Sequence, residues 1–189
     1  MVLRALNVVS SLQFYIDLDL HYSDGVSEAF LSTSKTPSIL TLSIHHAAPG
    51  FFPVSDHATL TPLETNHPNS LSIPLLEGAS NATFERIWMN CVEPVKNAFC
   101  PDFVIVQCGV DGLAGDPCAT WNLGLDIHTP GSLGWMVHCA LEWDKKTLLL
   151  GGGLQIFHRD PTTFSKSIYL LRLNQVAMTR RTRHGRGLI

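Results

Sequence analysis

The residues best suited to chemistry are two aspartates and a histidine at alternate positions, Asp17, Asp19 and His21, in the stretch FYIDLDLHYSDGV. Alternate residues of a β-strand project from the same face, so these three side chains are expected to lie together. The rest of the stretch reads as a buried strand, and burying one unpaired carboxylate costs several kcal/mol. A partner that neutralises these acids is therefore required.

Two more segments have the character of a site. Asp111 follows the apolar run VIVQCGV, and LLLGGG is a glycine-rich strand end at which the backbone must approach another group closely. Two carboxylates and one imidazole at the ends of neighbouring parallel strands predict a divalent metal site, because they balance the charge and leave positions for water and substrate. A hydrogen-bonded network of buried aspartates is the alternative.

The elements that must position these residues alternate along the chain. Strand-like segments are expected at 14–20, 38–44, 69–75, 103–110 and 146–152. Apolar residues at helical spacing predict helices within 81–99, with Ser80 or Asn81 as N-cap and a kink at Pro94, and within 130–143. This alternation predicts an α/β fold: an open, mainly parallel sheet with helices on both faces and its chemistry at the carboxyl ends of the strands.

Composition limits the class of protein. The 189 residues are 45% hydrophobic with a formal net charge of −3, which favours one sizeable core and gives no global basic signature for nucleic acid. No apolar run reaches the ~18 residues of a membrane span, so no membrane partner is expected. Five cysteines without C-x-x-C spacing suit a reducing compartment, as small buried hydrophobic residues.

Charge changes abruptly near residue 153. Residues 1–153 hold six Lys and Arg against fifteen Asp and Glu, whereas residues 154–189 hold seven against one. We interpret 1–153 as a catalytic domain and 154–189 as a divergent basic tail. A basic segment that contacts DNA or acidic partners is the alternative for the tail.

Four motifs now carry a resemblance: YIDLDLHYSDGVSEAF, HHAAPGFFP, VIVQCGVDGLAGDP and LLLGGG. Their order and spacing resemble the class I zinc-dependent histone deacetylases, which have the arginase–deacetylase fold, over roughly Gln13 to Gly153. The resemblance implies zinc-dependent hydrolysis of acetyl-lysine in histone tails, in the nucleus or shared with the cytoplasm. It implies acetylated histone tails, or other acetyl-lysine proteins, and corepressor subunits as partners.

The resemblance also assigns residues. It makes Asp19, His21 and Asp111 the zinc ligands, and Asp17 the residue that orients a catalytic histidine. A structural potassium ion would be held by groups of Asp17, Asp19, His21, Ser43 and Ile44, and a second one near Phe30 and Thr33. These cations would neutralise the buried acids. Phe52 would form a wall of the acyl-lysine tunnel, and Gly152 and Gly153 would keep its floor clear of side chains.

Two parts of the family pattern are missing. No histidine precedes Asp17, where the family has a catalytic His-His pair upstream, and GGGLQIF places Leu154 and Gln155 where the family has Gly-Tyr. We therefore expect a partial catalytic domain with little activity alone. Three alternatives stay open: His45 or His46 as the base, a non-catalytic pseudo-deacetylase that binds acyl-lysine or corepressors, and arginase-like or acetylpolyamine chemistry.

Overall fold

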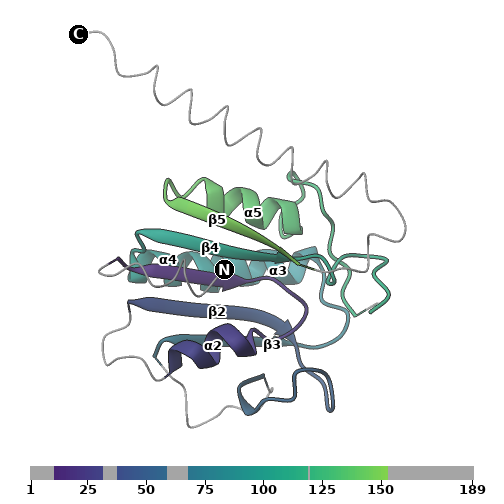
Figure 1. Cartoon of the computed structure of the whole chain (residues 1–189). Coiled ribbons are helices and arrows are strands. Elements are labelled where there is room, and N and C mark those ends of the chain that lie inside the picture. Colours follow the sequence, from purple (N-terminus) through teal and green to yellow (C-terminus); the bar gives the residue numbers. More distant parts are fainter. Residues whose placement is uncertain (1–10, 32–37, 59–67, 119, 153–189) are drawn as a thin grey trace, which may run out of the picture. The chain divides into compact units, whose positions relative to one another are not determined.

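The computed structural model describes residues 11–31, 38–58, 68–118 and 120–152. A sheet of five strands runs through these residues (Figure 1). Its strands are β1 (Gln13–Asp17), β2 (Ile39–His46), β3 (Ser70–Leu75), β4 (Phe103–Gly109) and β5 (Lys146–Gly152). The helical segments are α2 (Asp24–Leu31), η1 (Asp56–Ala58), α3 (Asn81–Ile87), η2 (Trp88–Val92), α4 (Glu93–Phe99) and α5 (Leu133–Leu141).

The strand order is β3-β2-β1-β4-β5, and every pairing in it is parallel. The prediction of an open α/β sheet is thus confirmed, with the sheet wholly rather than mainly parallel. Each position of β1 and β2 is buried, as expected for central strands covered on both faces. The central place of β1 puts its carboxyl end between those of β2 and β4.

Helices cover both faces of the sheet, as the sequence predicts. Phe14 contacts the rings of Phe99, the last residue of α4, and Trp143, which follows α5. Its neighbour Tyr15 belongs instead to the cluster that contains Phe30 of α2. Consecutive strand residues face opposite ways, so α4 and the end of α5 lie on one face and α2 on the other (Figure 1).

The helical stretch 81–99 is divided by a π-helical turn. Ser80 is the N-cap, and its N–H donates to Thr83 Oγ1 at 3.4 Å. Residues 88–92 form η2, where the Glu93 N–H donates to the Trp88 carbonyl five residues back. Pro94 has no N–H to donate to the carbonyl four residues before it, and the wider turn accommodates that loss. The distortion expected at Pro94 is therefore this π turn.

The structure differs from the sequence analysis at three points. The first strand ends at Asp17 rather than at residue 20. Helix α2 was not predicted, because its eight residues contain only a short apolar pattern and a glycine. The cysteines are free but not buried: Cys91, Cys100 and Cys118 are exposed, and Cys108 and Cys139 are partly exposed.

Within the described part of the chain, no helix has both the length and the apolar character needed to cross a membrane.

Candidate metal centre

The segment after β1 turns at two aspartates. The Asp19 N–H donates to Asp17 Oδ1 at 3.0 Å, and the His21 N–H donates to Asp19 Oδ1 at 2.9 Å. Aspartate side chains that accept an N–H two residues further on make local turns, which is why the strand stops at Asp17. The strand-alternation argument is therefore wrong for Asp19 and His21: this pair of turns, not a strand face, brings them together.

Asp17 is buried beneath this turn with only 4% of its surface exposed. The Tyr15 hydroxyl donates to Asp17 Oδ2 at 2.7 Å, so both carboxylate oxygens have a donor. Burial still raises the pKa of Asp17 to about 7, against the lowering effect of the Tyr15 and Asp19 hydrogen bonds. Asp17 is thus held in one orientation by its own strand.

Asp111, two residues after the end of β4, lies next to the turn that follows β1. The Leu20 N–H donates to Asp111 Oδ1 at 3.0 Å, which fixes the carboxyl group against the turn after β1. Gly109, the last residue of β4, lies against Asp19: a Cβ there would meet Asp19 Cα at 2.5 Å. The glycine is required because the two chain segments approach each other too closely for any side chain.

The imidazole of His21 completes the group. Its Nδ1 lies 2.9 Å from Asp111 Oδ2 and 3.2 Å from Asp19 Oδ1. These two hydrogen bonds, the Asp111 bond first, raise the pKa of His21 to about 10. Burial alone would raise the pKa of Asp111, but the bonds from His21 and the Leu20 N–H lower it. The same contacts thus favour a positive charge on His21 and a negative charge on Asp111.

One ligand atom from each of Asp19, His21 and Asp111 lies within 4.8 Å of the others. Oxygen and nitrogen ligands sit about 2.0–2.2 Å from Zn²⁺, so they must lie close together in this way. The three side chains remain 19%, 33% and 12% exposed, which leaves access for water or a substrate. The donor set therefore fits a divalent metal whose ligand from His21 is Nδ1.

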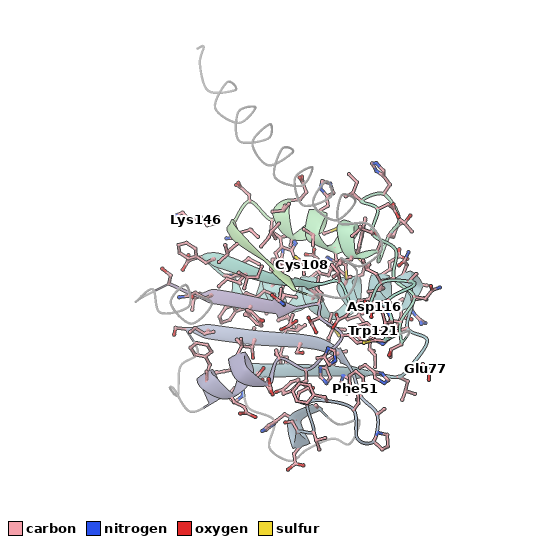
Figure 2. The ribbon with its side chains drawn as sticks, turned by 45° about the vertical axis from the view of Figure 1, so that its right-hand side comes forward. Phe51, Glu77, Cys108, Asp116, Trp121 and Lys146 are labelled. Carbon is pink, nitrogen blue, oxygen red and sulfur yellow. The ribbon has the colours of Figure 1, made fainter. Side chains whose placement is uncertain are left out.

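Two phenylalanines flank the candidate metal centre. The Phe51 ring stacks on His21 with centroids 5.1 Å apart and meets His46 edge-on at 4.6 Å. Phe52, the residue predicted to line a tunnel, is 71% exposed, and its ring meets that of His21 edge-on with centroids 6.3 Å apart. Figure 2 shows Phe51 and Asp116 at the carboxyl end of the sheet, opposite Lys146, which begins β5.

The other residues named from the sequence are placed as follows. Ser43 is the register partner of Asp17, and its hydroxyl lies 3.1 Å from His45 Nδ1. Ile44 is buried in β2, and Phe30 is buried in the cluster with Tyr15. Gly152 ends β5 beside Gly109. Thr33, Gly153, Leu154, Gln155 and the tail 154–189 lie outside the described residues, so the predicted division of the chain stays a prediction.

Sequence reasoning missed two residues of this centre. Tyr15 is two positions before Asp17 on the strand, and that spacing was the signal that it could reach the carboxylate. Gly109 lies within an apolar run in which a glycine has no obvious purpose, and only the approach of Asp19 explains it.

These observations define a class: an α/β protein with a cluster of two carboxylates and an imidazole at the carboxyl edge of a parallel sheet. The family model of the histone deacetylase domain matches residues 5–162. The chain belongs to the histone deacetylase family.

Curated relatives agree with this assignment. The chain is 36% identical over 139 residues to histone deacetylase 8 of Xenopus laevis and to histone deacetylase 8 of Danio rerio. It is 32% identical to histone deacetylase clr6 of Schizosaccharomyces pombe. Each match covers 74% of this chain but only 40%, 35% and 32% of the respective relative. The chain therefore spans two fifths or less of the length of these relatives.

Proposed function

We propose that this chain is part of a zinc-dependent deacetylase that removes acetyl groups from lysine side chains of proteins. The observation that carries the proposal is the convergence of Asp19, His21 and Asp111 within 4.8 Å beside an exposed phenylalanine. When bound, zinc supplies a Lewis acid for the acetyl carbonyl. Acetylated histone tails are the proposed substrates and the nucleus the proposed location, with corepressor subunits as partners.

The chain's own residues supply binding and orientation. Asp19, His21 through Nδ1, and Asp111 would hold the metal. Asp17, held by Tyr15, would orient a catalytic histidine. Phe52 offers an exposed apolar face to the substrate. Four lysine methylenes at ~0.8 kcal/mol each give about 3 kcal/mol of binding from such a wall. Ser43 is the register partner of Asp17. We include both in the proposed structural potassium site, together with groups of Asp19, His21 and Ile44.

A second candidate is a pseudo-deacetylase that binds acyl-lysine without hydrolysing it. The state of the two neighbouring histidines favours it. His45 has no exposed surface, and burial lowers its pKa to about 4. His46 is 7% exposed and donates from Nδ1 to the Leu75 carbonyl at 3.1 Å. His45 is enclosed and is a weak base. The Leu75 bond leaves Nε2 of His46 as the acceptor, but this ring is covered edge-on by Phe51 at 4.6 Å and has little access to a substrate water.

One experiment separates the two candidates. The purified chain is loaded with zinc, its metal content is measured by elemental analysis, and acetyl-lysine and unmodified lysine peptides are titrated while acetate release is followed. Deacetylase function predicts acetate release that chelation abolishes. The binding module predicts a preference for the acetylated peptide with acetate release at background. Absence of stoichiometric metal would contradict the zinc proposal.

A further inference from the structure

A cavity of about 330 Å³ borders Phe51, the residue whose ring stacks on His21. It is formed mainly by the loop after β2, and its lining includes His46, Ala48, Phe51, Val54, Ser55 and Ala58. Its volume is at the lower end of the ~300–1,000 Å³ typical of ligand sites. The cavity is therefore large enough to accept one bulky side chain.

The chemistry of this lining selects an apolar group. Among the lining residues that the structure describes, only His46 and Ser55 carry polar side chains, and His46 already commits Nδ1 to the Leu75 carbonyl. None of these described residues carries a carboxylate, ammonium or guanidinium group. A charged ligand group would lose its hydration here without gaining a partner, whereas an aliphatic or aromatic group gains free energy from burial.

The cavity opens to solvent at two of its lining residues. Val54 is 84% exposed and Ala48 is also exposed, so the lining is accessible from outside. Phe51 contributes to the cavity wall and also stacks on His21 with centroids 5.1 Å apart. One aromatic ring thus separates the cavity from a candidate metal ligand.

The cavity lies next to Phe52 along the chain, because Phe51 and Pro53 both line it. This short reach is comparable with the spacing of side chains along an extended peptide. Neighbouring side chains point in opposite directions, and residues two apart point the same way at about 6.5–7 Å. A peptide that inserts an acyl-lysine beside Phe52 would therefore present a side chain two positions away to the cavity. Its neighbour at one position would point to solvent.

We propose that this cavity is a substrate subsite that takes an apolar side chain two residues from the acyl-lysine. The inference rests on the proposed acyl-lysine function and deepens it, because it names a class of peptide sequence. Peptides would then be selected by two side chains, the acyl-lysine beside Phe52 and the apolar side chain in the cavity lined by Phe51. The residue between them is free to vary.

The test uses the whole zinc-loaded chain and fluorescently labelled acetyl-lysine peptides. Serine occupies the flanking positions, and leucine is placed two residues before or two residues after the acetyl-lysine. We expect one of the two leucine peptides to bind about tenfold more tightly than the all-serine peptide, which is within the effect of burying a leucine side chain. Alanine methyl NMR gives a second readout, because Ala47, Ala48 and Ala58 line the cavity.

Two variants fill or charge the cavity at exposed positions where folding is little affected: Ala48→Phe and Val54→Asp. Each is expected to bring the leucine preference below threefold without changing the affinity for the all-serine peptide. Met89→Asp is the matched control, since Met89 is 56% exposed in η2, outside the cavity lining, and it should retain the preference.

The outcomes distinguish this inference from the proposed function. Acetyl-lysine binding with no leucine preference overturns the subsite and leaves the deacetylase family function standing. Leucine-dependent methyl shifts of the three alanines without any gain from the acetyl group support the subsite and overturn acyl-lysine binding. Absence of both effects overturns both, and a preference that survives Ala48→Phe and Val54→Asp overturns the location.

Discussion

His21 and Asp111 are ninety positions apart in the sequence, yet His21 Nδ1 lies 2.9 Å from Asp111 Oδ2. The contact exists because β1 pairs directly with β4, so the residues that follow the two strands meet at one edge of the sheet. Asp19 joins them through the turn that it makes with the His21 N–H. The positions of Asp19, His21 and Asp111 thus depend on the β1–β4 pairing and on the turn between Asp19 and His21.

The first prediction concerns the proposed metal ligands. Asp111→Asn removes a proposed anionic ligand but keeps an oxygen that can accept from the Leu20 N–H. We expect zinc affinity to fall by at least roughly 10- to 100-fold, the effect of losing even an outer partner of a metal site. Competition with a chromophoric chelator measures the affinity. Glu77→Gln, an exposed carboxylate after β3, is the control and should bind zinc as the native chain does.

The second prediction concerns the close approach at Gly109. An alanine Cβ there would collide with the carboxylate and Cα of Asp19. Gly109→Ala should therefore lower the free energy of unfolding by about 1–3 kcal/mol, the usual cost of overpacking, and weaken zinc binding as well. Urea denaturation and the chelator assay measure the two effects. Gly25→Ala is the control, because a Cβ added there meets no atom within 4 Å. Equal losses of stability and zinc affinity in the two variants would refute this explanation.

The third prediction is a pH effect. His45 is buried and uncharged in the folded chain, and burial lowers its pKa from 6.5 to about 4. Between these values the unfolded chain binds the extra proton, so stability contributed by His45 is present above pH 6.5 and is lost as pH falls to 4. The full loss is about 3 kcal/mol, at 1.36 kcal/mol per pKa unit.

Asp17 opposes this trend, because burial raises its pKa to about 7 and stability then falls as pH rises toward 7. The two contributions are separated by comparing the native chain with His45→Gln, which keeps a polar side chain but does not titrate. Urea denaturation at several values from pH 4 to 7 should show that the stability difference between the two proteins narrows on acidification. A difference that does not change with pH would contradict a buried neutral His45.

The fourth prediction concerns Trp88 and Trp143, whose rings stack on each other on the face of the sheet opposite α2. Glu93 Oε1 accepts from Trp143 Nε1 at 2.7 Å and from Trp88 Nε1 at 3.2 Å. Glu93→Ala leaves both indole N–H groups without this acceptor and should cost roughly 2–3 kcal/mol. Chemical denaturation followed by tryptophan fluorescence measures the loss. Glu85→Ala, an exposed acid in α3, should change stability by less than about 0.5 kcal/mol.

The sequence was informative where one physical effect dominates. The continuous apolar run of β4 and the alternation of strands with helices are sufficient to predict a covered parallel sheet, and the strand-end rule places Asp111 near the first strand. The local path of residues 17–21 could not be predicted, since side chains that accept backbone N–H groups override the strand pattern there. The contact between Gly109 and Asp19 depends on three-dimensional packing and leaves no local signal.

The position of β1 at the centre of the sheet also orders events during synthesis. A ribosome adds ~5–20 residues per second, so Asp19 and His21 emerge several seconds before Asp111, which is ninety residues later than His21. Until β4 docks, β1 has only β2 as a neighbour, and the β1–β4 pairing is of high contact order and slow to form. Capture of a metal ion at the proposed site would therefore follow this pairing and could not nucleate it.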